Sequence, residues 1–280
     1  MDCPLCKSSD NINLFHTYPS FKLLECKACE LLFQTEAEHI NEQDMVQAIY
    51  NESWIKMREQ YAHLTFQDHA TFNTLQLEMF APQKGRLLEI GSGTGEFLHM
   101  AKHAGWDVTG LEPSSLSCRY AMQHYQLELI PTILTDELAN RLEPFEAIAI
   151  WHVLEHVPKP VAFLNQVADL LKDDGVLFFS VPNLKSFMNT SYGAHSPIFT
   201  EVDHLYHYSE KSIPLLLEHT PFSIEALFTR QLANQLEQIY RKKFGASSLK
   251  LEAKMALMSN LQGQGKGHEI CCVARKRNNK

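Results

Sequence analysis

From residue 86 onward, short apolar runs alternate with amphipathic stretches along the chain. The apolar runs predict strands at 86–90, 107–111, 145–151 and 176–181. The amphipathic stretches predict helices at 95–104, 114–125 and 160–171. A weaker run at 127–132 contains Pro131, which disfavours a central strand. Strands that alternate with helices form a parallel sheet with right-handed crossovers and helices on both faces. The pattern therefore predicts an α/β fold.

The pattern is different on either side of this region. Residues 37–80 contain neither Pro nor Gly and carry apolar residues at helical intervals, which predicts one or two helices. Beyond the alternating region, we expect a helix at 209–219, strands at 222–229 and 270–274, and a helical excursion between these strands. The chain then divides into residues 1–36, a helical connector at 37–80, and a domain at 81–280 with an insertion at 231–267.

Composition and charge narrow the classes of function. The 280 residues are 45% hydrophobic and 21% charged, as in ordinary folded proteins. A formal net charge of −8 argues against broad nucleic-acid binding. No apolar run reaches the ~18 residues that span a bilayer. The first residues lack the basic and apolar segments of a secretory signal. We expect a cytoplasmic chain without a membrane partner, and the sequence leaves its oligomeric state open.

Four of the seven cysteines form two Cys-x-x-Cys pairs near the N-terminus, at positions 3, 6, 26 and 29. This spacing lets two tight turns direct four thiolates, Cys3, Cys6, Cys26 and Cys29, at one tetrahedral zinc ion. Such a site has no open position for water, so we expect a structural zinc flanked by short strands at 21–24 and 31–33. The alternatives are free thiols or a redox dithiol, which would need a βαβ scaffold before Cys3.

A glycine-rich segment, Gly91-Ser92-Gly93-Thr94-Gly95, directly follows the predicted strand 86–90. The dinucleotide fingerprint would require glycine at position 96, where this chain has Glu96. A carboxylate there would repel a pyrophosphate. Glu112, which ends the next strand, can accept hydrogen bonds from ribose hydroxyls. The loop therefore suits a nucleoside ligand without phosphate.

Three segments together resemble the class I S-adenosylmethionine-dependent methyltransferases. Residues 88–95 resemble their first motif, residues 110–114 their ribose-binding segment, and residues 150–157 the stretch after their fourth strand. The resemblance covers roughly residues 85–275. It implies a Rossmann-like doubly wound sheet, preceded here by a small zinc-ribbon-like module. It also implies that the following residues bind S-adenosylmethionine: Glu89, Gly91, Ser92, Gly93, Gly95, Glu112, Pro113, Asp136 and Trp151.

Two of these residues have a second interpretation. Asp136 either positions the adenine or caps a helix. Trp151 either lines the methyl end of the cofactor or is a buried core aromatic.

The candidate acceptor side contains two groups of histidines, one around His152 and His156 and one around His204 and His207. Methyl transfer needs a positioned nucleophile, and a histidine can serve as its general base. Residues 204–209 resemble a segment of methyltransferases in sugar and glycan biosynthesis. Some of those enzymes carry an N-terminal zinc module and methylate a carbon of a nucleotide-linked keto sugar.

In those relatives a Tyr-His-Glu-His run supplies the base. Laid over this chain, its last histidine falls on His204, its glutamate on Asp203 and its tyrosine on Glu201. The resemblance implies His204, Asp203 and His152 as catalytic candidates, while the change at Glu201 speaks against the C-methylation chemistry. His204 can alternatively cap the following helix, and a structural role in the strand-to-helix turn fits His156.

The sequence thus predicts a methyltransferase that acts on a small molecule, a sugar or glycan intermediate. One alternative is an RNA methyltransferase that docks RNA on the zinc module, although lysines and acidic residues balance there. The other is a binding module that keeps the fold without turnover.

Overall fold

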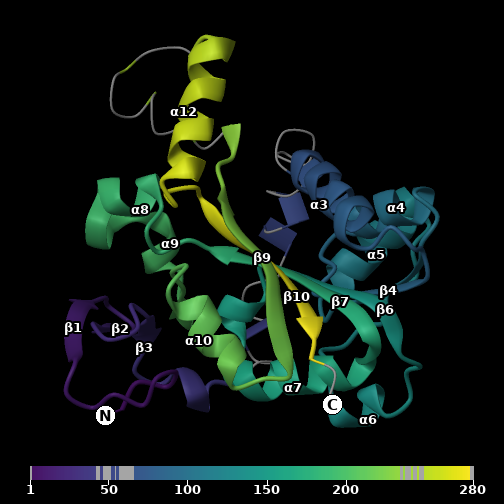
Figure 1. The fold of residues 1–280 in the computed structure, drawn as a ribbon, viewed down its shortest axis with the longest axis horizontal. Helices are drawn as coiled ribbons and strands as arrows, with labels where there is room; N and C mark the ends of the chain where they lie inside the picture. The colour runs from purple at the N-terminus through teal and green to yellow at the C-terminus, as the bar shows by residue number, and fades with distance from the viewer. Residues whose placement is uncertain are drawn as a thin grey trace.

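The computed structural model describes residues 2–41, 45–46, 52–53, 55–56, 66–233, 236, 241, 245 and 249–277. Much of the predicted connector helix and part of the predicted insertion lie outside these residues. The described chain forms two sheets and a set of helices that cover them (Figure 1).

The larger sheet has six strands in the order β5-β4-β6-β7-β10-β9. They are β4 (Arg86–Ile90), β5 (Asp107–Leu111), β6 (Phe145–Trp151), β7 (Leu171–Pro182), β9 (Phe222–Arg230) and β10 (Glu269–Lys276). Strands β4 to β7 pair in parallel, as the alternating pattern predicts. Strand β10 lies antiparallel between β7 and β9, because the connection from β9 leaves and re-enters the sheet at the same end. The predicted Rossmann-like α/β fold is confirmed.

The weak strand expected at 127–132 is reduced to a single parallel bridge between Leu111 and Ile130. Pro131 follows this bridge and has no N–H with which to continue a ladder.

Helices cover both faces of the large sheet. One face carries α3 (Gln67–Phe80), α4 (Glu96–His103) and α5 (Ser115–Tyr125), and the other carries α7 (Pro160–Leu170) and α10 (Ser212–Glu218). Side chains of β6 alternate between these faces: Ala147 and Ala149 pack toward α3 and α4, while Ile148 and Ile150 pack toward α7 and α10. Figure 1 shows α12 (Leu251–Gly263) extending away from this layered body.

The remaining short helices lie in connections. They are η1 (Ala37–His39), α6 (Asp136–Ala139), η3 (Leu154–His156), α8 (Phe187–Tyr192), η4 (Gly193–His195) and α9 (Pro197–Thr200). Within the described residues, no helix has the length and apolar character needed to cross a membrane.

The smaller sheet joins the N-terminal segment to the rest of the chain. Its order is β1 (Ile12–Thr17), β2 (Lys22–Cys26), β3 (Leu32–Gln34) and β8 (Tyr206–His207), all antiparallel. The strands β2 and β3 match the apolar runs of the sequence, whereas β1 and β8 have no clear pattern. Because β8 comes from the segment after α9, the N-terminal strands share a sheet with the segment that carries His204.

Candidate active site

A cavity of about 540 Å³ opens at the carboxyl ends of β4, β5 and β6. Ligands of open α/β sheets bind at this edge. Most of the residues singled out from the sequence line it: Glu89, Gly91, Ser92, Gly93, Glu112, Pro113, Trp151, His152, Asp203 and His204. Two do not: Gly95 is the N-cap of α4, and Asp136 begins α6. The cavity therefore brings the glycine segment and both histidine groups to one place.

The glycine segment forms a tight turn that other residues would not fit. Gly91, Gly93 and Gly95 all have positive φ, at 76°, 54° and 89°. A Cβ on Gly91 would lie 2.4 Å from the Cγ2 atom of Val153. A Cβ on Gly95 would come within 3.1 Å of Ala121 on α5. Gly91 thus keeps the cavity floor open, and Gly95 allows close packing of α4 on α5.

Glu112 ties the glycine turn to the end of β5. Its carboxylate is buried and accepts hydrogen bonds from the backbone N–H of Gly93 and of Ser114, both at 2.8 Å. A carboxylate offers about four acceptor positions, so it can also receive hydrogen bonds from ribose hydroxyls.

Asp136 lies outside the cavity, in the first turn of α6. Its Oδ1 accepts a hydrogen bond from Gln166 Nε2 at 2.7 Å, and Thr135 is the residue that caps this helix. The cavity wall here consists of Thr132, Ile133 and Leu134 instead. Their mainly apolar side chains suit the face of a flat base. Thr132 ends the weak apolar run at 127–132, and Ile133 and Leu134 follow it. This run was the signal in the sequence that could have located the wall.

Trp151, at the end of β6, both lines the cavity and packs in the interior. Its ring meets Phe97 edge-on at 5.4 Å between centroids and Phe178 at 6.4 Å. Trp151 can therefore both line the cofactor site and pack as a core aromatic.

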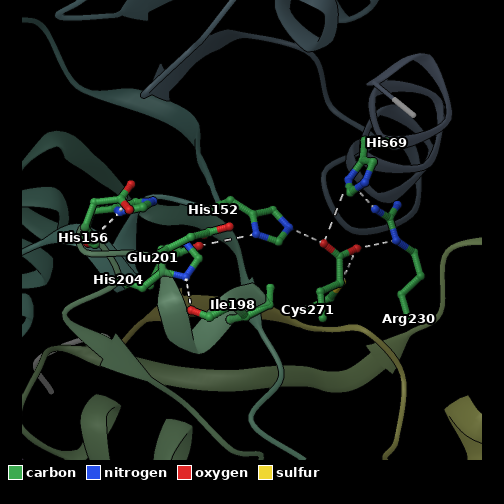
Figure 2. Close-up of polar contacts among 11 residues, drawn as sticks. His69, His152, His156, Ile198, Glu201, His204, Arg230 and Cys271 are labelled. Carbon is green, nitrogen blue, oxygen red and sulfur yellow. Dashed lines mark hydrogen bonds and ion pairs between the residues drawn. The ribbon is translucent and has the colours of Figure 1, made fainter. Parts of the chain in front are cut away.

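His152 directly follows β6 and lies between two carboxylates (Figure 2). Its Nε2 is 2.5 Å from Glu269 Oε2, and its Nδ1 is 3.4 Å from Glu155 Oε1. Burial alone would lower the pKa of His152. The hydrogen bonds to Glu155 and Glu269 outweigh this effect and raise the pKa to about 10. His152 is therefore an imidazolium at neutral pH. Its φ of 54° is a left-handed conformation that the two carboxylate contacts help to hold.

Glu269 belongs to a buried charge network that no local motif predicts. Arg230 of β9 pairs through Nε with Glu269 and donates from Nη2 to His69 Nδ1 at 2.6 Å. Burial lowers the pKa of His69 to about 3, so its imidazole is neutral. Burial raises the pKa of Glu269, but Arg230, His69 and His152 together bring it below its usual range. These four residues come from α3, β9, β10 and the turn after β6.

The second histidine group lies in the segment between α9 and β8. His204 Nε2 is 2.9 Å from Glu201 Oε2, and its Nδ1 is 3.2 Å from the carbonyl oxygen of Ile198 (Figure 2). Burial lowers the pKa of His204, but the contact with Glu201 outweighs it and the pKa is raised.

His156, at the end of η3, contacts the same segment. Its Nδ1 is 2.9 Å from the backbone carbonyl oxygen of Asp203 and 3.4 Å from Asp203 Oδ2. Burial lowers the pKa of His156 despite the nearby carboxylates of Glu155 and Asp203. The rings of His156 and His204 are 4.8 Å apart between centroids.

The N-terminal strands position this segment. Gln34 at the end of β3 donates from Nε2 to the carbonyl oxygens of Val202, at 2.9 Å, and His204, at 3.1 Å. Its backbone N–H donates to Leu205 at 2.9 Å. These hydrogen bonds attach the backbone around His204 to β3.

The four N-terminal cysteines form a separate cluster. Cys3 Sγ lies 3.5 Å from Cys29 Sγ, Cys6 Sγ lies 3.5 Å from Cys26 Sγ, and all four sulfurs are within 4.8 Å of one another.

Each Cys-x-x-Cys turn of this cluster is closed by a residue with positive φ, Lys7 at 58° and Glu30 at 63°. The backbone N–H groups of these two residues donate to the carbonyls of Cys3 and Cys26, respectively. Four thiolates in this arrangement fit a tetrahedral zinc ion.

Comparisons with known proteins agree with this geometry. A family model described as "Methyltransferase domain" matches residues 54–227. A ubiquinone biosynthesis O-methyltransferase of Haemophilus ducreyi is 31% identical over 134 residues, which cover 44% of this chain and 57% of that protein. The chain spans about half the length of the curated relatives it matches.

Solved structures share the fold at low sequence identity. A SAM-dependent methyltransferase from Archaeoglobus fulgidus has a TM-score of 0.54 and 16% identity, covering 80% of this chain and 99% of that one. The plantazolicin methyltransferase BpumL in complex with SAH has a TM-score of 0.56 and 14% identity, covering 85% of this chain and 95% of that one. At these identities the likeness concerns the fold alone.

Proposed function

This chain belongs to the methyltransferase domain family, and on that premise we propose that it transfers a methyl group from S-adenosylmethionine to a hydroxyl oxygen of a small molecule. The observation that carries the proposal is the cavity at the carboxyl ends of β4, β5 and β6. It combines a glycine turn without room for side chains, a buried carboxylate and a histidine-rich wall. S-adenosylmethionine supplies an electrophilic methyl group there.

The chain's own residues fit this donor in three parts. The turn at Gly91, Ser92 and Gly93 leaves space for the amino-acid end, next to Glu89. Glu112, followed by Pro113, is placed to receive the ribose hydroxyls. The wall at 132–134 offers an apolar surface for adenine, while Trp151 borders the methyl end. Gly95 supports the turn from outside the cavity, and we give Asp136 no direct contact.

We propose oxygen as the accepting atom for two reasons. The relatives in ubiquinone biosynthesis are named O-methyltransferases. In addition, this chain has Glu201 where the C-methylating relatives have the tyrosine of their catalytic run, and Glu201 pairs with His204. The segment at 204–209 favours a sugar or glycan hydroxyl as the acceptor, and the relatives' names make a ubiquinone precursor the second candidate.

His152, His204 and Asp203 take positioning roles in this proposal. His152 and His204 each direct both ring nitrogens at acceptor oxygens, so their N–H groups donate hydrogen bonds to these partners. Asp203 orients His156 through its carbonyl oxygen and its carboxylate. The contacts of His204 with Glu201 and Ile198 favour this positioning role over the role of general base.

A methyl-transfer assay with product analysis tests the function. The purified chain is incubated with S-adenosylmethionine and either sugar nucleotides or hydroxylated ubiquinone precursors, and methylated products are examined by NMR. We expect a methyl signal typical of an O–CH₃ group with one of the two acceptor classes. A product methylated on carbon, or methyl transfer only to RNA, would contradict the proposal. The Glu112→Ala variant serves as the control for donor binding.

A further inference from the structure

The histidines at the acceptor side of the cavity differ in how their ring nitrogens are used, and this inference rests on the function proposed above. A general base needs a ring nitrogen whose lone pair faces the cavity. Hydrogen bonds to the second nitrogen decide which tautomer is present. The contacts of four histidines therefore decide which ring can serve as the base: His69, His152, His156 and His204.

His152 and His204 cannot accept a further proton. Both nitrogens of His152 face carboxylates, those of Glu269 and Glu155. Both nitrogens of His204 face oxygens that only accept, those of Glu201 and Ile198. Each ring must therefore carry two N–H groups to satisfy its partners.

His69 is neutral but is also unsuited to the task. Its Nδ1 accepts a hydrogen bond from Arg230 at 2.6 Å, so its lone pair is already engaged and its proton is on Nε2.

His156 has the complementary arrangement. Its Nδ1 faces the backbone carbonyl of Asp203 at 2.9 Å, and a carbonyl oxygen only accepts, so Nδ1 carries the proton. This tautomer leaves the lone pair on Nε2 of a ring that lines the cavity. Among the histidines that the structure describes at this cavity, we infer that His156 is the general base and takes the acceptor's hydroxyl proton on Nε2.

The acceptor oxygen forms a bond to the methyl carbon as the bond from that carbon to the sulfonium sulfur breaks. The sulfur keeps the electron pair and S-adenosylhomocysteine leaves as a neutral thioether. The hydroxyl proton moves to Nε2 of His156, which becomes an imidazolium and later releases the proton to solvent.

The charged groups around His156 suit this proton cycle. They are Glu155 of η3 and Glu201, Asp203 and His204 of the facing segment, with the titratable ring of His207 on β8 beside them. Burial and the charge of His204 keep the pKa of His156 below its usual value of 6.5, so the ring is neutral at pH 7. Glu155 and Asp203 stabilise the imidazolium once it forms. The base is therefore both unprotonated at rest and able to receive a proton.

Nitrogen NMR of the histidine rings in the protein without ligands tests the tautomer independently of activity. We expect the His156 signals to show a neutral ring protonated on Nδ1 at pH 7, with a titration midpoint below 6.5. The His204 ring should titrate at a higher pH than the His156 ring. The His156→Gln and His204→Gln variants assign the signals. A doubly protonated His156 at pH 7, or a His204 ring that titrates at a lower pH than His156, would overturn the inference.

Kinetics test the role itself. His156→Gln should lower kcat by about 100-fold or more at pH 7, with the Kd for S-adenosylhomocysteine within about twofold of the native value. Its residual activity should rise with pH without a plateau. In His204→Gln, the fall of kcat toward acidic pH should persist. Its midpoint should move upward because a nearby cation is lost. His103→Gln, an exposed change on α4, is the matched control.

Two kinetic outcomes would refute the role. One is a fall of kcat toward acidic pH that disappears in His204→Gln but persists in His156→Gln. The other is a native midpoint above 6.5. If His156→Gln does not fold, the ring NMR of the native protein still decides the matter.

Discussion

At the scale of single residues, the buried carboxylate of Glu269 lies among three basic side chains. It is 1% exposed and contacts Arg230 and His152, with His69 3.9 Å away. A buried ion is tolerated only where partners compensate its lost hydration, and removing one partner leaves the others as uncompensated charges. His152 owes its raised pKa to the carboxylate of Glu155 and to this one.

The Glu269→Gln substitution should therefore be strongly destabilising. We expect the free energy of unfolding to fall by about 3–5 kcal/mol, measured by urea denaturation. The matched control is Glu225→Gln, which removes the partner of Arg275 in a partly exposed pair on the same sheet. That change should cost less than about 1 kcal/mol. Equal, small effects in the two variants would show that the Glu269 network does not contribute to stability.

The pKa of His152 gives the same network a pH dependence. Its pKa rises from 6.5 to about 10 on folding, so protonation of His152 stabilises the folded state. This contribution is complete below pH 6.5, declines as the pH rises, and is lost above about pH 10. The melting temperature should fall between pH 7 and 10 more steeply in the native protein than in His152→Gln. Parallel curves for the two proteins would contradict the assignment.

At the scale of elements, the turn between β4 and α4 determines whether a ligand can enter the cavity. Gly91→Ala would both strain a backbone with φ of 76° and place a methyl group 2.4 Å from Val153. Gly105→Ala imposes similar backbone strain at φ of 97° with nothing within 4 Å, so it controls for strain alone.

The prediction is that Gly91→Ala weakens S-adenosylhomocysteine binding by at least about tenfold, which is about 1.4 kcal/mol, while Gly105→Ala leaves it unchanged. Calorimetry measures both. Unchanged binding by a folded Gly91→Ala variant would remove this turn from the binding site.

The N-terminal sheet is the second element with a functional consequence. Strand β3 holds the backbone at Val202, His204 and Leu205 through Gln34, so zinc binding at the cysteine cluster should order the acceptor segment. We expect one zinc ion per chain in the native protein, which Cys26→Ser should lose and Cys118→Ser should retain.

Cys26→Ser should also lower kcat/KM for the acceptor by at least about tenfold, because loss of a structural zinc loosens the strands around it. Binding of S-adenosylhomocysteine should remain. Elemental analysis and calorimetry distinguish these effects. A native protein that contains no zinc after purification with zinc present would contradict the metal assignment.

Across the whole molecule, sequence patterns predicted the features that depend on residues close together in the chain. The strands at 86–90 and 145–151 could be placed from their apolar runs because they are buried on both faces, and the edge strand at 107–111 because its end at Gly110 and Leu111 is buried. The glycine segment and Glu112 could be identified because their chemistry depends on neighbours in sequence. The strand β8 and the network around Glu269 could not, because each joins segments more than a hundred residues apart. The protonation of His156 and His204 likewise depends on backbone carbonyls that no motif specifies.

The central claim is that the cavity at the ends of β4, β5 and β6 binds S-adenosylmethionine. Calorimetric titration of S-adenosylhomocysteine into the zinc-loaded protein, alongside Glu112→Ala, tests it most directly. We predict saturable binding by the native chain that weakens by about tenfold or more, or about 1.4 kcal/mol, in the variant. No binding by a folded native protein, or equal binding by both proteins, would contradict the account.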